Sequence, residues 1–278
     1  MKLSVAIAGK DAPDNAFVVW RGFEESTRKA AELGFHGIEL ALKEASEVDP
    51  TRLAALLSEH GLEASCVTTG QVCAVLGLYF THPDSSVRAR TLEVFKELIN
   101  LASDFGQLVN IGRARGWYAE GQPREETEQL FIDTCRTLCD YAAPRNVTIM
   151  IEPVNRYEIN FINSVVEGAE LLDRVERDNL GLMPDVFHMN IEDIGIGKTL
   201  AAYIDRINYV HLADSNRLAP GQGHLDFDDV FAGLRRGNYD GWVSIEILPK
   251  PDPESAAEQA ARTLLPMVER YNRGDDFM

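Results

Sequence analysis

The chain has 278 residues, 45% of them hydrophobic, and a formal net charge of −17. A field of that sign repels nucleic acid phosphates and anionic membrane surfaces, so neither is an expected partner. No run approaches the ~18 apolar residues of a membrane-spanning helix, and the first residues lack the apolar core of a signal peptide. With four cysteines and no Cys-x-x-Cys pair, we expect a soluble, cytoplasmic protein with reduced thiols.

Short β-rich runs alternate with longer amphipathic segments along the whole chain. In chain order, the predicted strands are Leu3–Ala8, Gly37–Leu42, Ala64–Thr68, Leu108–Ile111, Val147–Glu152, Leu180–Asp185, Ile207–His211 and Trp242–Glu246. The helices predicted after them are Glu25–Leu33, Thr51–His60, Ser85–Phe105, Glu125–Ala143, Ser164–Val175, Lys198–Tyr203, Asp228–Arg236 and Pro253–Tyr271.

Strict alternation of strand and helix predicts a parallel sheet, because every crossover between parallel strands needs a covering helix. Eight such units without a break in composition favour a closed α/β barrel, the (β/α)₈ TIM barrel, over an open sheet. We expect one barrel domain over residues 1–272 and a loose tail at 273–278. The glycine-rich signatures of dinucleotide-binding and phosphate-binding loops are absent from the sequence.

The last four predicted strands each end in a residue that can bind a metal: Glu152, Asp185, His211 and Glu246. In TIM barrels the catalytic residues project from this end of the strands, so all four side chains can converge over one rim. Any one of them could instead be a helix cap or a solvated loop charge, but that explanation is poor for all four together.

Three carboxylates and one imidazole form an oxygen-rich ligand set without sulfur. Such a set suits an octahedral Mn²⁺, Mg²⁺ or Co²⁺ with open positions better than a closed structural zinc. Without a cation the clustered carboxylates would repel one another and take up protons. The sequence therefore predicts one divalent metal ion, with Mn²⁺ as the first expectation.

Other polar residues follow the same strands. Glu158, His188 and Arg217 are candidates for binding substrate hydroxyls, although simple loop-stabilising contacts explain each of them as well. Arg113 and Arg115 follow the fourth predicted strand, and we expect Arg115 to pair with the carboxylate if the substrate is a sugar acid. Surface salt bridges are the alternative for both arginines.

Four stretches carry a family resemblance: Ile151–Glu158, Asp185–Asp193, His211–Arg217 with Pro220–Gly223, and Val243–Glu246. At these residues the chain resembles the xylose-isomerase-like TIM barrel superfamily and, within it, the ketose 3-epimerase group. The similarity includes epimerases that act on 5-keto-L-gluconate, D-tagatose and D-psicose. It is dense in the second half of the chain. In the first half it rests on the strand–helix rhythm and on Thr69-Gly70-Gln71.

The resemblance implies an isomerase that inverts C3 of a ketose or keto-sugar acid. It implies that Glu152, Asp185, His211 and Glu246 bind the metal, and that Glu158, His188 and Arg217 contact the ketose end of the substrate. Glu152 and Glu246 would also be the acid and base, one removing a proton beside the carbonyl and the other returning one to the opposite face of an enediolate. Group members are often dimers or tetramers, so a homo-oligomer is also expected.

Other activities of the superfamily stay open on the sequence. Isomerisation between aldose and ketose, including the hydroxypyruvate type, uses similar residues and is the main alternative, followed by dehydration of a cyclic polyol. An abasic-site endonuclease needs a histidine-rich zinc cluster, which six histidines in a strongly acidic chain do not favour. From another class, an inactive sugar-binding barrel is disfavoured because both glutamates are present.

Overall fold

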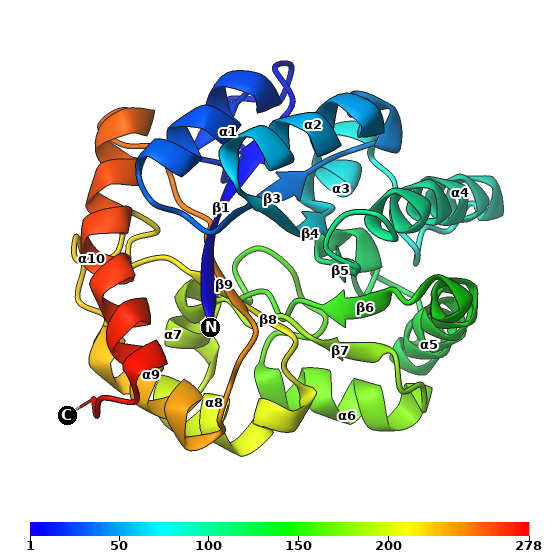
Figure 1. The fold of residues 1–278 in the computed structure, drawn as a ribbon. Helices are drawn as coiled ribbons and strands as arrows, with labels where there is room; N and C mark the ends of the chain where they lie inside the picture. Colours follow the sequence, from blue (N-terminus) through cyan, green and yellow to red (C-terminus); the bar gives the residue numbers. More distant parts are fainter. Residues whose placement is uncertain (278) are drawn as a thin grey trace.

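The computed structural model describes residues 1–277, and Met278 of the predicted tail lies outside the described residues. Parallel strands form a nearly closed barrel that helices surround (Figure 1). The eight barrel strands are β1 (Lys2–Ala8), β3 (Gly37–Ala41), β4 (Glu63–Thr68), β5 (Leu108–Ile111), β6 (Thr148–Ile151), β7 (Leu180–Leu182), β8 (Tyr209–Leu212) and β9 (Trp242–Ile245). This arrangement confirms the predicted single-domain TIM barrel.

Each barrel strand from β1 to β6 pairs with the next barrel strand along the chain, β8 pairs with β9, and β9 returns to pair with β1. The seam between β7 and β8 contains two isolated parallel bridges, Leu182 with Ile207 and Asp185 with His211. A further two-residue strand, β2 (Trp20–Arg21), pairs with the end of β1. β7 ends sooner than predicted, before Pro184, a residue that has no N–H to donate to a strand ladder.

The predicted helices are present with small shifts of their ends: α1 (Phe23–Glu32), α2 (Pro50–His60), α4 (Ser85–Ala102), α5 (Arg124–Ala142), α6 (Val165–Val175), α8 (Ile196–Tyr203), α9 (Phe227–Arg236) and α10 (Pro253–Arg273). Side-chain caps mark where five of them begin, namely α2, α4, α6, α9 and α10. Asp49, for example, accepts the N–H groups of Thr51 and Arg52 at the start of α2. None of the helices in the described part of the chain is long and apolar enough to cross a membrane.

Two further helices, α3 (Gly70–Leu76) and α7 (Val186–Glu192), were not predicted. Each has seven residues, too few for a helical period to stand out in the sequence. Each begins shortly after a barrel strand, β4 or β7, at the end where the site lies. Four 3₁₀ turns complete the described elements: η1 (Ala45–Glu47), η2 (Arg113–Arg115), η3 (Ala143–Arg145) and η4 (Ile204–Arg206).

The residues of a strand alternate between two environments. In β3, Ile38 and Leu40 belong to the main apolar core, whereas the residue between them, Glu39, is completely buried among polar groups. Because successive side chains of a strand point to opposite faces, Glu39 faces the barrel interior. Tyr209 reaches Glu39 in that interior. The barrel interior therefore contains buried polar groups beside a small apolar cluster of Cys66, Met150, Met183 and Tyr209.

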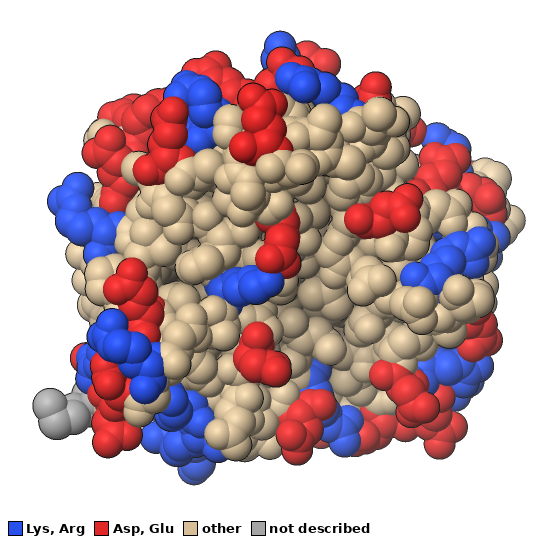
Figure 2. All heavy atoms as spheres, in the orientation of Figure 1, with Lys and Arg blue, Asp and Glu red and all other residues tan. Residues whose placement is uncertain are grey.

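Charged side chains are spread over the molecule. On the face shown in Figure 2, acidic and basic groups are interspersed around the edge, without a broad basic patch.

At the carboxyl terminus, the ring of Phe277 lies 5.4 Å from that of Phe231 on α9.

Candidate active site

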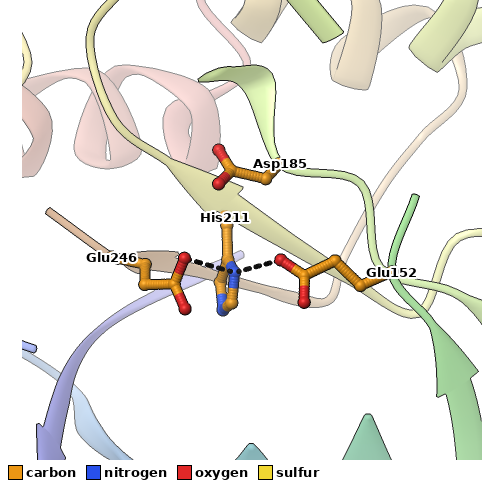
Figure 3. Close-up of side chains that lie close together, drawn as sticks. All are labelled: Glu152, Asp185, His211 and Glu246. Carbon is orange, nitrogen blue, oxygen red and sulfur yellow. Dashed lines mark ion pairs between the residues drawn. The ribbon is translucent and has the colours of Figure 1, made fainter. Parts of the chain in front are cut away.

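The four residues predicted as metal ligands lie together at the carboxyl ends of the strands. One ligand atom from each of Glu152, Asp185, His211 and Glu246 lies within 4.8 Å of the others. Glu152 and Glu246 directly follow β6 and β9, His211 belongs to β8, and Asp185 is the N-cap of α7. Figure 3 shows the two glutamates approaching His211 from opposite sides, with Asp185 beside it. The Nδ1 atom of His211 lies 3.5 Å from Glu152 Oε1 and 3.7 Å from Glu246 Oε2.

The polar atoms of this cluster fit a divalent cation. Asp185 Oδ2 and His211 Nδ1 are buried and have no hydrogen-bond partner within the described chain. Buried polar atoms are normally paired, and apart from an ion pair of Asp185 Oδ2 with Arg217 at 3.3 Å these two atoms lack a partner, which a metal ion would supply. The second polar atom of each side chain already has a partner. Asp185 Oδ1 accepts the N–H of Phe187 at 2.9 Å, and His211 Nε2 lies 3.0 Å from Glu39 Oε2. Three oxygen donors and one nitrogen donor match a hard divalent ion.

Burial makes the negative charges of the cluster costly. It raises the pKa of the Asp185 and Glu246 carboxyls above their ordinary values, although His211 and Arg217 oppose the effect. A bound cation would favour the ionised carboxylates and so offset this cost. The cost of burying these charges and the buried atoms without hydrogen-bond partners therefore both favour a metal ion at this cluster.

Arg217 connects the cluster to the loops above it. Its guanidinium contacts the carboxylate of Glu246, lies 3.3 Å from His188 Nε2 and 3.5 Å from Glu158 Oε1. The ring of Phe17 lies 3.9 Å from the guanidinium carbon and fixes the plane of the group. The three residues predicted to contact substrate, Glu158, His188 and Arg217, thus lie together at the edge of the metal cluster.

His188 is a neutral group in this arrangement. Burial lowers the pKa of its imidazole well below the ordinary value, and Arg217 lowers it further. Its Nδ1 atom lies 2.7 Å from the side-chain amide nitrogen of Asn155, so Nδ1 accepts and Nε2 carries the proton. The Nε2–H can therefore donate to a substrate oxygen.

A cavity of about 260 Å³ opens above the cluster. Its polar end contains Glu152, Glu246, Glu158, His188 and Arg217. The remaining wall is mostly apolar, with a few polar groups, and includes Phe17, Val18, Ala41, Gln71, Ala74, Arg113, Val154 and Leu248. A concave site with apolar walls and a few convergent polar groups is typical of a small-molecule pocket.

The structure does not place Arg115 at the cavity, where it was expected to pair with the carboxylate of a sugar acid. Arg115 is completely buried, and its guanidinium donates to the carbonyl oxygens of Gly112, Glu152, Phe161 and Ile162. It therefore holds the loop after β6 against the end of β5 and is not among the residues that line the cavity. Arg113, two residues earlier in η2, lines the cavity instead. Its nearest carboxylate in the described chain is Glu158, at 3.8 Å.

Two residues that support the cluster were missed by the sequence analysis. Asn110 in β5 donates to Glu152 Oε2 at 3.0 Å, and Glu39 in β3 contacts His211. Both lie within strands, whereas all four predicted ligands are residues at the ends of predicted strands. A polar or charged residue inside an otherwise apolar strand, as in Gly37-Ile-Glu-Leu-Ala41, is the signal that could have revealed them.

Comparisons with known proteins identify the family to which this barrel is similar. The profile of a family described as Xylose isomerase-like TIM barrel matches residues 27–267. The chain is 33% identical over 232 residues to the L-ribulose 3-epimerase of Methylomonas sp. (strain DH-1), which covers 81% of this chain and 78% of that relative. It is 31% identical over 234 residues to the ketose 3-epimerase of Arthrobacter globiformis, covering 81% of this chain and 77% of the relative.

A solved structure extends the similarity to nearly the whole chain. The D-allulose 3-epimerase from Methylomonas sp., crystallised in complex with D-allulose, superposes with a TM-score of 0.80 at 27% identity. The match covers 98% of this chain and 97% of that one.

Proposed function

This chain belongs to the xylose isomerase-like TIM barrel family, and we propose that it is a metal-dependent epimerase that inverts C3 of a ketose or keto-sugar acid. The two relatives described above are named L-ribulose 3-epimerase and ketose 3-epimerase, and the chain is accordingly an enzyme of the isomerase class. The predicted family membership and the enzyme class are thereby confirmed. The position of the inverted carbon, the metal and the substrate remain part of the proposal.

One observation carries the proposal: two carboxylates face a common point from opposite sides. Glu152 and Glu246 come from β6 and β9 and approach His211 Nδ1 from either side (Figure 3). Inversion at a carbon requires that a proton leave one face and that another arrive on the opposite face. We infer that one glutamate removes the proton beside the carbonyl, through an enediolate, and that the other protonates the far face, with exchanged roles in the reverse direction.

A divalent ion held by Glu152, Asp185, His211 and Glu246, with Mn²⁺ as our first choice, would stabilise the negative charge that develops on the substrate oxygens. The protein supplies the other interactions. Arg217 and the Nε2–H of His188 can donate to the ketose oxygens beside the cluster, and Asn110 orients Glu152. The apolar wall of the cavity, which includes Phe17 and Leu248, excludes water from the reacting carbon.

Arg113 supports the inclusion of sugar acids among the substrates. It is the lining cation that is not committed to the metal cluster, because Arg217 is held by Glu246 and Asp185. A guanidinium at the cavity wall can pair with a carboxylate at the distal end of an open-chain substrate. We therefore propose Arg113, in place of Arg115, for the role expected from the sequence.

The compartment and the assembly are further parts of the proposal. All four cysteines are free thiols, which suits the reducing cytoplasm, where we propose that the enzyme acts. The homo-oligomer expected from the resemblance stays a prediction.

The test is proton exchange measured by NMR. The enzyme is loaded with Mn²⁺ and incubated in D₂O with ketopentoses, ketohexoses and keto-hexonates, and the metal is removed before spectra are recorded. Deuterium at C3 with inversion would support the proposal and rank the substrates. Deuterium at C1 or C2 with an aldose product would instead identify an aldose–ketose isomerase. Absence of exchange on every substrate would favour a dehydratase or an inactive sugar-binding barrel.

A further inference from the structure

Glu39 is a completely buried carboxylate at the centre of the barrel, and the proposed reaction does not use it. It lies on β3 and reaches across the interior to His211 on β8, so that Glu39 Oε2 is 3.0 Å from His211 Nε2. Burying a carboxylate costs several kcal/mol unless donors surround it. A charged residue in this position therefore indicates a role that an apolar side chain could not fill.

We propose that Glu39 is a positioning residue that keeps the proton of the His211 imidazole on Nε2, so that the Nδ1 lone pair faces the metal cluster. An imidazole that binds a metal is neutral and carries one proton, and a carboxylate only accepts hydrogen bonds, so the nitrogen that faces Glu39 must be the donor. Nδ1 is then the free acceptor, and it is this atom that lies between Glu152 Oε1 and Glu246 Oε2 without a partner in the described chain.

The position of Glu39 is itself fixed from both sides. The hydroxyl of Thr68 donates to its Oε1 at 2.9 Å, and the hydroxyl of Tyr209 donates to its Oε2 at 3.1 Å. Ser4 and Ser65 contact the same Tyr209 oxygen at 2.8 and 2.7 Å. The carboxylate is thus held by groups from β1, β4 and β8, and through it the barrel interior orients the imidazole.

This inference rests on the proposed metal site and adds to it a residue outside the four ligands. Carboxylates that orient a metal-binding imidazole typically change metal affinity by roughly 10–100-fold when they are removed. We expect Glu39→Ala to weaken Mn²⁺ binding by that factor. Glu39→Gln keeps an oxygen that can accept the Nε2–H, so its loss should be smaller than that of Glu39→Ala.

The experiment combines Mn²⁺ affinity, measured by isothermal titration calorimetry, with the tautomer of His211, measured by ¹⁵N NMR on Mg²⁺-loaded protein with labelled histidine. At Mg²⁺ concentrations at which the wild type and Glu39→Gln show Nδ1 bound to the metal and the proton on Nε2, Glu39→Ala should still show a fraction of unbound imidazole with mixed tautomers. Tyr209→Phe is the matched control, because it keeps the ring, whose centroid lies 5.7 Å from that of His211, and removes only one donor to Glu39. Thr68 still donates to Glu39 Oε1, so this variant should keep both the affinity and the tautomer.

The outcomes separate this inference from the proposed function. If Asp185→Asn binds Mn²⁺ as tightly as the wild type, the metal site itself is misplaced. If Asp185→Asn loses binding while Glu39→Ala keeps wild-type affinity and the Nε2 proton, only the role of Glu39 is wrong. Equal losses in Glu39→Ala and Tyr209→Phe would reduce Glu39 to a general packing role and overturn the inference. Should Glu39→Ala not fold, Glu39→Met, which conserves volume, takes its place with the same expected losses.

Discussion

Asp185 and His211 face each other across the seam of the barrel, where they form a parallel backbone bridge beyond the end of β7. The N–H of His211 donates to the carbonyl oxygen of Pro184 at 2.9 Å, next to Asp185. Paired strands lie about 5 Å apart, so the bridge places two of the proposed ligands side by side before any metal binds. The closure of the barrel and the geometry of the candidate metal centre are therefore one structural feature.

Removal of either acid/base carboxylate should abolish epimerisation. We expect Glu152→Gln and Glu246→Gln each to lower kcat by roughly 10²–10⁴-fold, the usual contribution of a general acid or base. Each variant should still exchange the C3 proton of one epimer, and the two variants should prefer opposite epimers. Steady-state kinetics and C3 deuterium exchange measure both effects. Glu97→Gln, at an exposed position of α4, is the control, and full turnover by Glu246→Gln would disprove the assignment.

Replacement of Asp185 should weaken metal binding without preventing folding. In Asp185→Asn the new side chain can still cap α7, where Asp185 accepts the N–H of Phe187, but it lacks the charge of a carboxylate ligand. A metal at 100 times its Kd stabilises a protein by about 2.7 kcal/mol, and a tenfold weaker site reduces this to about 1.4 kcal/mol. Melting temperatures with Mn²⁺ and with EDTA should show the difference. An unchanged Mn²⁺-induced shift in Asp185→Asn would contradict the predicted ligand set.

Arg113 should distinguish keto acids from neutral ketoses. A hydrogen bond to a charged group contributes about 1.5–3 kcal/mol, so Arg113→Leu should raise KM for a keto-hexonate by roughly 10–100-fold. KM for a neutral ketose should stay near the wild-type value. Arg113→Lys keeps the positive charge and should restore part of the affinity for the acid. Parallel kinetics on the two substrate classes test this, and equal losses on both would rule out a carboxylate contact.

Arg115 should affect stability and leave specificity unchanged. Burial lowers the pKa of its guanidinium to about 10, so the group stays charged at neutral pH and satisfies four carbonyl oxygens. Arg115→Met leaves the carbonyls of Glu152 and Phe161 unpaired, whereas those of Gly112 and Ile162 keep backbone N–H donors, and it should lower the free energy of unfolding by at least about 2 kcal/mol, measured by urea titration. The ratio of kcat/KM for keto acids and neutral ketoses should not change. A selective loss of activity on the acids would return the carboxylate role to Arg115.

Asp193 should make stability depend on pH. Burial raises the pKa of this carboxyl to about 6, and its Oδ2 atom has no partner within the described chain. Because the folded state then binds more protons than the unfolded state between about pH 4 and 6, stability falls as pH rises through that interval. Asp193→Asn removes the effect and should gain about 1 kcal/mol at pH 8, since the group is only partly buried, and almost nothing near pH 4.

Thermal melts of the two proteins from pH 4 to pH 8 measure the gain. Asp178→Asn, at an exposed position, is the control and should show no such trend. A gain for Asp193→Asn that is equal at all pH values would show that Asp193 titrates at its ordinary pKa.

The sequence alone determined the barrel and the ring of candidate ligands. Apolar periodicity is a local property, and it predicted all eight barrel strands with ends within three residues of those observed. Because the ends of parallel strands meet at one rim, strand order was enough to bring Glu152, Asp185, His211 and Glu246 together.

Only the tertiary structure decided which polar residues serve the site and which serve the fold. Arg113 and Arg115 have the same chemistry two positions apart, and the turn of η2 places one at the cavity and buries the other against carbonyl oxygens. Glu39 and His211 are 172 positions apart in sequence, and their contact exists only because β3 and β8 face each other across the closed barrel. Such contacts depend on how distant segments pack, so a local pattern can mark Glu39 as unusual in its strand but cannot identify its partner.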